Sequence, residues 1–394
     1  MNLMRPLIPI FTVLFLVTQV NGQDRIITTG VPFLLITPDA RAAGMGELGV
    51  ATSPDSYAQQ WNPAKYAFSQ SNSGLGLSYT PYLRQLVDDI FLGSLTYFNK
   101  INERSAWATS LKYFSYGNVQ FNNIMAGTII DQGSKRPNEI TLDLSYSLKL
   151  SERFAMSVAG RFLRSDLKIH TDMDATSANT LGVDISGFYQ SLNFDMGKFD
   201  GLARAGFNIS NIGPRLKYDE GGQMDFIPTN LRVGTGMDLI FDKFNILGVY
   251  LEFSKLLVPT PVIFLDNKNQ PQGYRQPDIN FLNGIFSSFN DAPGGIKEEL
   301  KEITWALGFE YTFAETLAIR TGYFNESEEK GSRRYMTFGA GLELNGITID
   351  ISYLSSTSKI RNPLENTLRF SLSFNFDGFS KGSEVEEVPA YVSE

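Results

Sequence analysis

The sequence predicts an all-β membrane protein, a 14-stranded antiparallel transmembrane β-barrel with an N-terminal segment held inside it. Three observations lead to this fold class. The chain begins with a secretory leader, most of its length alternates between apolar and polar residues, and its connections are short at some positions and long at others. Short turns on one side and long loops on the other are typical of outer-membrane barrels.

The composition favours strands, not helices, as the membrane-crossing elements. Aromatic residues make up 13% of the 394 residues, yet the mean hydropathy is only -0.12. In a barrel, lipid-facing apolar residues alternate with polar lumen residues, so the two sets average out. The net charge of -8 argues against nucleic acid as a partner. The lack of cysteine excludes thiol chemistry and zinc–thiolate sites.

Residues 1–22 are predicted to be a signal peptide. Arg5 precedes a short apolar run from Leu7 to Val17, and small and polar residues follow as far as Gly22. This order is typical of a secretory leader. The apolar run is too short to span a bilayer comfortably, which argues against a membrane anchor. We expect cleavage after Gly22, with Gln23 as the mature N-terminus.

A period of two dominates the predicted barrel, residues 73–376. From Leu368 to Phe376 every second residue is leucine or phenylalanine, and the residues between them are polar or charged. This period places the two sets on opposite faces of a strand. Most of the predicted strands have about 9–12 residues, enough to cross a bilayer at a tilt. They are expected to begin near Ser73, Ile90, Ser105, Glu139, Phe154, Gly182, Gly201, Asn230, Phe244, Ile303, Thr316, Arg334, Gly346 and Glu365.

The connections between strands predict an orientation in the outer membrane of a Gram-negative bacterium. Because the strand number is even, both termini are expected on the short-turn, periplasmic side, with the long loops outside. An acidic C-terminal tail, 377–394, is expected to follow the barrel. Tight turns are predicted at Asn99–Glu103, Leu150–Arg153, Phe241–Lys243, Ala314–Glu315 and Leu344–Gly346. Long loops are predicted at Ser115–Asn138, Leu163–Leu181, Asn211–Thr229 and Leu256–Glu302.

Charged residues of both signs fall on the expected lumen face. Buried charges must pair or stay hydrated, so we favour a salt-bridged, hydrated interior. A selective channel is the alternative. The residues are Asp143, Arg161, Arg204, Arg232, Asp238, Glu252, Glu310, Arg320, Glu343, Asp350 and Arg369.

Residues 23–72 do not alternate and are predicted to form a hatch inside the barrel. A barrel of this strand number is wide enough to need filling. The stretch Gly44–Gly49 matches G-x-G-x-x-G, but it lacks the preceding strand and following βαβ unit of a dinucleotide site. We therefore attribute its glycines to close packing against the barrel wall.

The hatch carries a family resemblance. The run from Pro38 to Gly46, followed by Trp61-Asn62-Pro63-Ala64, resembles the N-terminal signature of the PorV family, and the Asn-Pro-Ala step also resembles the hatch of FadL-type channels. The resemblance covers essentially the whole chain after the leader. PorQ proteins share the motif, while the overall length and the loop Leu256–Glu302 favour PorV. The structural hatch residues that it marks are Asp39, Arg41, Gly44, Gly46, Trp61, Asn62 and Pro63.

This resemblance implies a FadL-like barrel that works, without enzymatic activity, in the type IX secretion system. PorV-type proteins bind the C-terminal signal domain of secreted cargo at the translocon and carry the cargo to the sortase. The implied partners are a SprA/Sov-type translocon barrel, cargo signal domains, a PorU-type sortase attachment complex, and outer-membrane lipid and lipopolysaccharide. A FadL-like channel for hydrophobic small molecules is the alternative, and the charged lumen argues against it.

No catalytic residue, cofactor or metal site is expected. The single histidine, His170, is predicted in an outer loop, and its neighbours Ser165 and Asp166 do not form a triad in an extended segment. The sequence has no G-x-S-x-G element and no zinc-binding histidine pair.

The loop Leu256–Glu302 is too long for a plain connection, which indicates a function or a structure of its own. A short helix is expected from Ile296 into the tenth strand. Exposed aromatic residues suggest a partner surface. Alternatively, the loop folds back and caps the lumen around the same aromatic residues. The candidates are Phe264, Tyr274, Phe281, Phe286 and Phe289.

Overall fold

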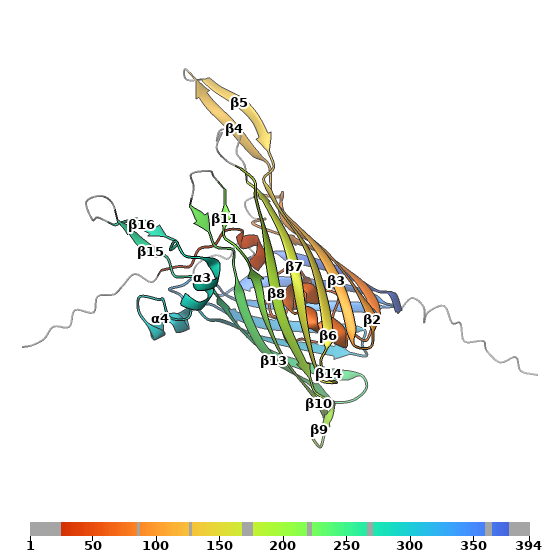
Figure 1. Ribbon diagram of the computed structural model, residues 1–394. Coiled ribbons are helices and arrows are strands. Elements are labelled where there is room, and N and C mark those ends of the chain that lie inside the picture. The colour runs from red at the N-terminus through yellow and green to blue at the C-terminus, as the bar shows by residue number, and fades with distance from the viewer. Residues whose placement is uncertain are drawn as a thin grey trace, which may run out of the picture.

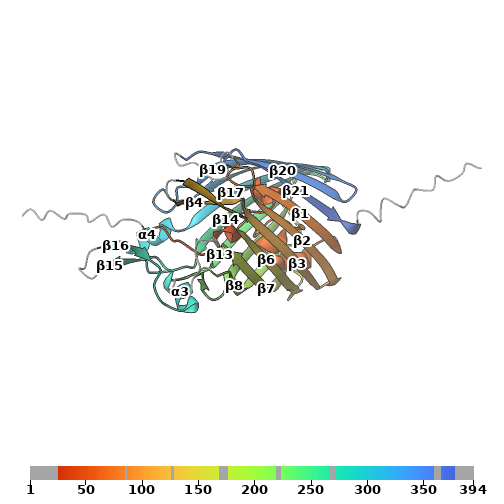
Figure 2. The ribbon, with the colours of Figure 1, turned by 90° about the horizontal axis from the view of Figure 1, so that it is seen from above.

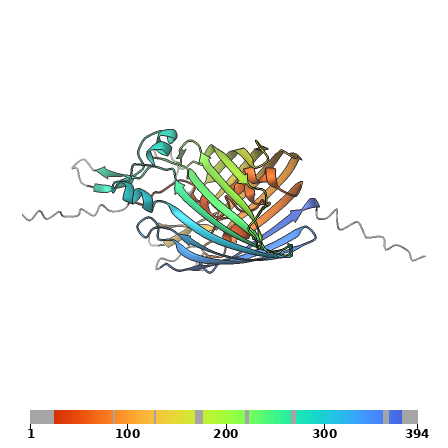
Figure 3. The ribbon, with the colours of Figure 1, turned by 90° about the horizontal axis from the view of Figure 1, so that it is seen from below.

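The computed structural model describes residues 25–84, 87–125, 128–167, 176–218, 223–265, 271–358 and 365–377. Within these ranges, 14 antiparallel strands hydrogen-bond in a closed ring around the N-terminal segment (Figures 1 and 3). The predicted signal peptide, His170 and the acidic tail after Asp377 lie outside them. The ring consists of β1 (Ser73–Pro81), β2 (Ile90–Asn102), β3 (Ser105–Tyr116), β6 (Asn138–Lys149), β7 (Phe154–Asp166), β8 (Ala178–Gln190), β10 (Asp200–Ile212), β13 (Asn230–Ile240), β14 (Asn245–Leu256), β17 (Thr304–Phe313), β18 (Leu317–Asn325), β19 (Arg334–Leu344), β20 (Ile347–Ser356) and β21 (Leu368–Asn375).

The predicted barrel is confirmed strand by strand. The ring closes where β1 pairs with β21, with Gly74 opposite Asn375. Most strands begin within a residue of the predicted position. The largest difference is at β8, which begins at Ala178 and not near Gly182. Its first residues are Ala, Asn and Thr. Alanine and asparagine are depleted in strands, so the sequence pattern gives no signal for the start of β8.

Strand β6 shows how the period of two divides lipid-facing from lumen-facing residues. Leu142, Leu144 and Tyr146 are exposed on the outer surface. Asp143 and Ser145, which lie between them, are buried inside the ring. The apolar outer face suits the bilayer, and the polar inner face provides hydrogen-bonding groups for whatever fills the lumen.

The N-terminal segment fills the lumen with four short helical turns: η1 (Pro32–Leu35), α1 (Ala40–Ala43), α2 (Ala58–Trp61) and η2 (Pro63–Phe68). Helix α1 contacts β19, β20 and β21, whereas η2 contacts β3, β6, β7 and β8. Figure 2 shows β19–β21 and β6–β8 as opposite walls of the barrel. The segment therefore reaches across the lumen from one wall to the other.

Glycines of the barrel wall let the segment approach very closely. The turn 44–46 lies against Gly308, Gly322 and Gly339, which stand on the neighbouring strands β17, β18 and β19. A Cβ atom on Gly322 would lie 2.1 Å from the carbonyl carbon of Met45, and one on Gly308 would lie 2.6 Å from the Met45 carbonyl oxygen. These wall positions have no room for any side chain. Gly44 and Gly46 of the hatch pack against the wall as predicted, with a Cβ atom at 3.0 Å from Gly339 and Tyr323, whereas Gly49 packs against Trp61 of the hatch itself.

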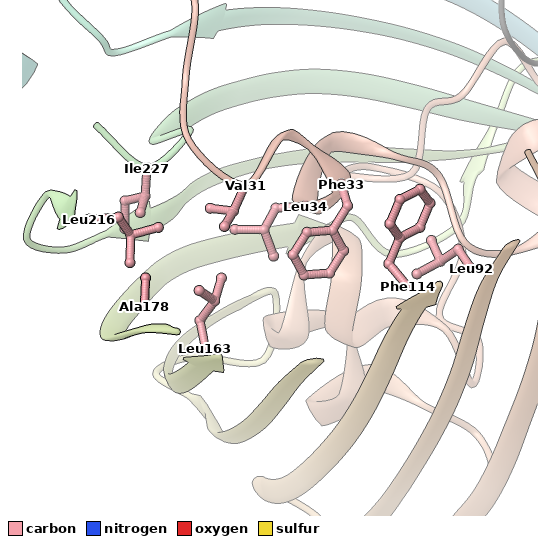
Figure 4. Packing of buried hydrophobic residues seen from close by; sticks show 9 residues of the cluster. All are labelled: Val31, Phe33, Leu34, Leu92, Phe114, Leu163, Ala178, Leu216 and Ile227. Carbon is pink, nitrogen blue, oxygen red and sulfur yellow. The ribbon is translucent and has the colours of Figure 1, made fainter. Parts of the chain in front are cut away.

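An apolar cluster lies at the long-loop end of the lumen (Figure 4). Val31, Phe33 and Leu34 come from the N-terminal segment. They meet side chains near the strand ends and in the loop that contains β11, so the inner polar face gives way to an apolar one at this end. Those partners are Leu92, Phe114, Leu163, Ala178, Leu216 and Ile227.

The long connections carry their own secondary structure at one end of the barrel (Figure 1). None of the helices in the described ranges could cross a membrane. The short-turn end holds one small extra strand, β9 (Phe194–Asp195), paired with β10. The long-loop elements are β4 (Val119–Met125), β5 (Thr128–Lys135), β11 (Leu216–Lys217), β12 (Met224–Asp225), β15 (Val262–Leu265), β16 (Pro271–Arg275), α3 (Phe281–Ser287) and α4 (Ile296–Lys301).

The two ends of the described chain lie at opposite ends of the barrel, which differs from the expectation that both share the short-turn end. At the end of β21, Asn375 N–H donates to the carbonyl of Gly346 at 2.6 Å, and Gly346 lies in a short turn. Arg25 instead contacts Pro261 and Lys330 in the long loops. The even strand number fixes only where the first strand begins and the last one ends. The segment before β1 is long enough to cross the lumen.

Replacing Gly322 with alanine tests the close approach of the hatch. We expect Gly322→Ala to lower the free energy of unfolding by about 1–3 kcal/mol, because the new methyl group overlaps Met45. Gly160→Ala is the matched control, since Gly160 on β7 has open space around it, and a change within about 0.5 kcal/mol is expected. Urea titration of the purified barrel, read from the mobility of unheated samples on gels, measures both. Equal midpoints would contradict the close contact.

Candidate functional site

Asp39 and Trp61 join the first and second halves of the hatch. Asp39 precedes α1, and its Oδ1 accepts a hydrogen bond from the N–H of Ala42 at 2.8 Å, which caps the helix. Its Oδ2 accepts from the indole N–H of Trp61, also at 2.8 Å. The indole lies over Gly49, where a Cβ atom would be 2.4 Å from the ring, and the Arg232 guanidinium of the wall lies 4.5 Å from the ring centre.

Asn62 and Pro63 fasten the hatch to the wall. The side-chain oxygen of Asn62 caps η2, and its amide donates to the carbonyls of Val50 and of Gly187 on β8, both at 2.9 Å. Pro63 stands at the start of η2, where no backbone N–H is needed. Its carbonyl accepts from the hydroxyl of Ser147 on β6 at 2.7 Å. An Asn-Pro pair thus begins a turn and binds two separate strands.

Arg41 joins the hatch to a row of buried charges on the wall strands β17, β18 and β20. Its guanidinium donates to Glu310 at 2.7 and 3.0 Å and to Asp55 at 2.6 Å. Glu310 also accepts from Arg320 at 2.6 Å, and Arg320 donates to Asp350 at 2.6 Å. Each of these five charged residues has a neighbour of opposite sign, so the alternation of sign offsets the cost of burial.

Most of the other predicted lumen charges pair in the same way, as expected for a salt-bridged interior, whereas Glu343 near the end of β19 is exposed and pairs with none of the described cations. Arg161 on β7 bridges Asp143 at 2.5 Å and Asp184 at 3.0 Å, which lie on the strands at either side. Arg369 pairs with Glu47 of the hatch at 2.6 Å. The remaining close pairs are Arg204 with Asp238 at 2.5 Å and Arg232 with Glu252 at 3.9 Å.

Three hatch residues of this network escaped sequence reasoning: Glu47, Asp55 and Lys65. Lys65 is fully buried and donates to the carbonyl of Gly49 at 3.0 Å and to the hydroxyl of Thr52 at 2.9 Å. The carboxylate of Asp55 lies 3.8 Å from its ammonium group. The hatch has no periodicity, so nothing in its pattern distinguishes an inward charge from a solvated one.

A cavity of about 420 Å³ lies between the hatch and the short-turn end of the barrel. Its lining is mostly charged or carries hydroxyl groups, including Arg41, Asp55, Arg204, Glu310 and Glu343. Such a lining holds water and polar groups and does not favour an apolar molecule.

The candidate partner residues lie on the loop between β14 and β17, away from the hatch residues. Phe264, Tyr274, Phe286 and Phe289 are exposed, and Phe286 is the most open at 74%. Phe281, at the start of α3, is half-buried. They occupy β15, β16, α3 and the turn after it, beyond the rim of the barrel (Figure 1). These aromatic side chains therefore do not form a core that caps the lumen; the cluster of Figure 4 occupies that place.

The described residues offer no group of three or more ligands able to hold a metal ion. The hydroxyl of Ser165 donates to Glu139 at 2.7 Å, and Asp166 pairs with Lys135 at 3.2 Å, so the two are committed to structural contacts. The G-x-G-x-x-G stretch follows α1 and not a strand, unlike a dinucleotide loop.

Comparison with known proteins gives one family match. The sequence model of the family described as "Type IX secretion system protein PorV" matches residues 19–263. A search of curated proteins found no match.

Among solved structures, the chain is similar to the toluene transporter TodX of P. putida, with a TM-score of 0.50 and 13% identity over 87% of this chain and 99% of that one. A TodX deltaS2S3 mutant, described as a monoaromatic hydrocarbon channel, gives 0.50 and 12% over 86% and 98%. A FadL homologue of Pseudomonas aeruginosa gives 0.47 and 11% over 90% and 100%. At this identity, the similarity to TodX establishes the fold alone.

Removing the negative charge of Glu310 tests the ion chain. We expect Glu310→Gln to lower the free energy of unfolding by about 3 kcal/mol, because Arg41 and Arg320 lose the carboxylate between them. The control is Glu315→Gln in the exposed turn after β17, which should change it by less than about 0.5 kcal/mol. The same urea titration compares them. A Glu310 variant as stable as the control would show that these ion pairs contribute nothing to the stability of the barrel.

Proposed function

Because the chain belongs to the PorV family of type IX secretion system proteins, and is therefore an outer-membrane β-barrel of that system, we propose that it is a non-enzymatic cargo carrier. In this proposal it binds the C-terminal signal domain of secreted cargo at a SprA/Sov-type translocon. It then brings the cargo to the PorU-type sortase complex, which attaches it to lipopolysaccharide.

The observation that carries this proposal is the contrast between a filled lumen and an exposed apolar rim. The turn 44–46 is in contact with wall glycines, and Arg41 is tied to β17 through Glu310. Together with the apolar cluster at the long-loop end, these contacts support the hatch as a fixed plug. A plugged barrel has its working surface at the ends, not along a pore.

The loop between β14 and β17 supplies the proposed protein-binding surface. Large aromatic side chains that are left exposed on a loop mark interaction sites, because removing their apolar surface from water lowers the free energy when a partner covers them. Phe286 and Phe289 lie close in sequence at the end of α3, and Phe264 and Tyr274 lie on a hairpin with no third strand. A two-stranded hairpin is marginally stable alone, so a partner that covers it would also order it.

This function requires the long loops to face the outside of the cell and the end of β21 to face the periplasm. The asymmetry supports that orientation, since β4–β5, β15–β16, α3 and α4 all lie at one end, while short turns dominate the other.

A FadL-like channel for hydrophobic molecules is less well supported by the cavities. The cavity next to the hatch is lined by charges. An apolar hollow of about 540 Å³ does exist, lined by residues such as Met237, Leu239 and Val249, but these side chains belong to the outer face of β13 and β14. An apolar route behind the hatch would be needed for a channel of this kind.

Deletion of the gene tests the proposal as a whole. Cargo with the C-terminal signal domain should no longer reach the sortase, and unprocessed cargo should accumulate inside the cell. Reintroduction of the intact gene should restore processing. Normal secretion and processing in the deletion strain would refute the proposal.

A double substitution in the rim, Phe286→Ser with Phe289→Ser, tests the proposed surface. We expect recovery of the translocon barrel or of cargo with the purified protein to fall by roughly tenfold or more, because two buried anchors at an interface are worth upwards of about 1.4 kcal/mol. The matched control is Leu150→Ser with Phe244→Ser, two exposed apolar residues at the opposite end. Both variants should reach the outer membrane in normal amounts. Equal recovery would place the contact elsewhere.

A further inference from the structure

The start of the described chain is bound among the long loops. The Arg25 guanidinium donates to the carbonyl of Pro261 at 2.9 Å and lies 5.6 Å from the centre of the Tyr274 ring. Its backbone carbonyl accepts from the ammonium group of Lys330, in the β18–β19 loop, at 2.9 Å. Figure 1 shows this red end of the chain beside α3 and α4, at the opposite end from the blue β21.

The next residues continue along the same loops. The carbonyl of Thr28 accepts from the side-chain amide of Gln276 at 2.6 Å. Gly30 N–H donates to the carbonyl of Phe226 at 2.9 Å. Residues 25–30, here named the strap, therefore connect the loop 213–229, the loop 256–302 and the β18–β19 loop.

The strap completes a charge cluster that lies at the base of α4. Lys330 pairs with Glu298 at 2.6 Å and with Glu302 at 3.0 Å. Lys255 at the end of β14 pairs with Glu299 at 2.9 Å and with Glu302 at 2.7 Å. All five side chains are buried or nearly so, although four of them lie in the loops beyond the strands.

The backbone of the strap supplies hydrogen bonds that this cluster lacks without it. Lys330 has three N–H donors and uses one on the Arg25 carbonyl. Burial raises the pKa of Glu298, but the hydrogen bonds from Lys330 and from the backbone N–H of Gly294, both at 2.6 Å, outweigh it and lower the pKa. The strap thus acts on the cluster through Lys330, as an acceptor for its ammonium group.

Behind the strap, the chain passes straight into the apolar cluster of Figure 4 through Val31, Phe33 and Leu34, and the hatch ends at Ser73 in the short-turn end. Residues 25–72 therefore run through the whole length of the barrel. Two anchors fix the outer end of this path, the apolar cluster and the loop contacts.

We propose that the strap is displayed on the cell surface, where it locks the loop 256–302 in the position that a partner protein meets, so that residues 25–30 belong to the outer interaction surface. This inference rests on the orientation given under the proposed function. The surface beside the strap combines Ile26, 55% exposed, with Tyr274 and the hairpin β15–β16. A protein that binds the aromatic loop would meet the strap as well.

Single cysteines test the display directly, because the chain has none of its own. Ile26→Cys is compared with Phe286→Cys at the long-loop end and with Lys243→Cys in a short turn, using a polyethylene glycol maleimide too large to cross the outer membrane. In intact cells, Ile26→Cys and Phe286→Cys should be labelled, and Lys243→Cys should be labelled only after the membrane is broken.

The outcomes separate the two proposals. Labelling of Phe286→Cys alone in intact cells would overturn the surface strap and leave the orientation standing. Labelling of Lys243→Cys in place of Phe286→Cys would overturn the orientation, and with it the surface display, whatever Ile26→Cys does.

Lys330→Met tests the lock itself. The substitution removes the contacts with Arg25, Glu298 and Glu302, so the loop 256–302 should unfold locally more often. Trypsin should then cleave after Lys297 and Lys301 several-fold faster on intact cells. Lys243→Met, at the opposite end, should leave the cleavage rate unchanged. If the two variants are cleaved equally fast while both barrels keep their unheated gel mobility, the strap does not hold the loop.

Discussion

The Arg41–Glu310 ion pair is the contact on which the interior arrangement depends. It joins a four-residue helix, too short to be stable alone, to the wall of the barrel. It also places a positive charge where Glu310 would otherwise face only Arg320. The hatch needs the wall for its shape, and the wall needs the hatch to balance its charges. Neither part could be exchanged for a neutral filler without leaving buried ions unpaired.

The same reciprocity explains why a wide barrel can be filled by so little regular structure. The hatch has few backbone hydrogen bonds of its own, so side chains such as Asp39 and Asn62 provide caps and links at fixed points. Close packing then requires wall positions with no side chain, which Gly308 and Gly322 supply. Backbone contact, hydrogen bonds and ion pairs are therefore concentrated at a few residues.

Much of the fold could be predicted from the sequence, because each strand must show lipid one face and the lumen the other. That requirement gave the faces of Leu142 and Asp143, the strand count and most starts. It could not give the pairing of Arg161 with both Asp143 and Asp184, since pairing depends on register. The hairpin β4–β5 was expected only as a loop, because its asparagine-rich strand Val119–Met125 gives a weak strand signal.

The path of the N-terminus shows the limit of reasoning from strand parity. The even strand number fixes the end of the barrel at which β1 begins, at Ser73, but it says nothing about the residues before it. The contacts of Arg25 with Pro261 and Lys330 join segments far apart in the chain. The hatch motif did identify residues that meet in space, including Asp39 with Trp61. The sequence identified the aromatic loop residues by their type. Their exposure depends on how the loop folds, which periodicity cannot predict.

The close fit of the turn 44–46 has a consequence for the order of folding. The hydrogen bond from Gly46 N–H to the hydroxyl of Thr337 joins residues 291 positions apart, and the Arg41–Glu310 pair joins residues 269 apart. Contacts of such sequence separation form late and slowly. The hatch therefore cannot take its final position until the last third of the chain, which carries Glu310 and Thr337, has arrived. The hatch is therefore synthesised before the barrel strands but is among the last parts of the protein to reach its final position.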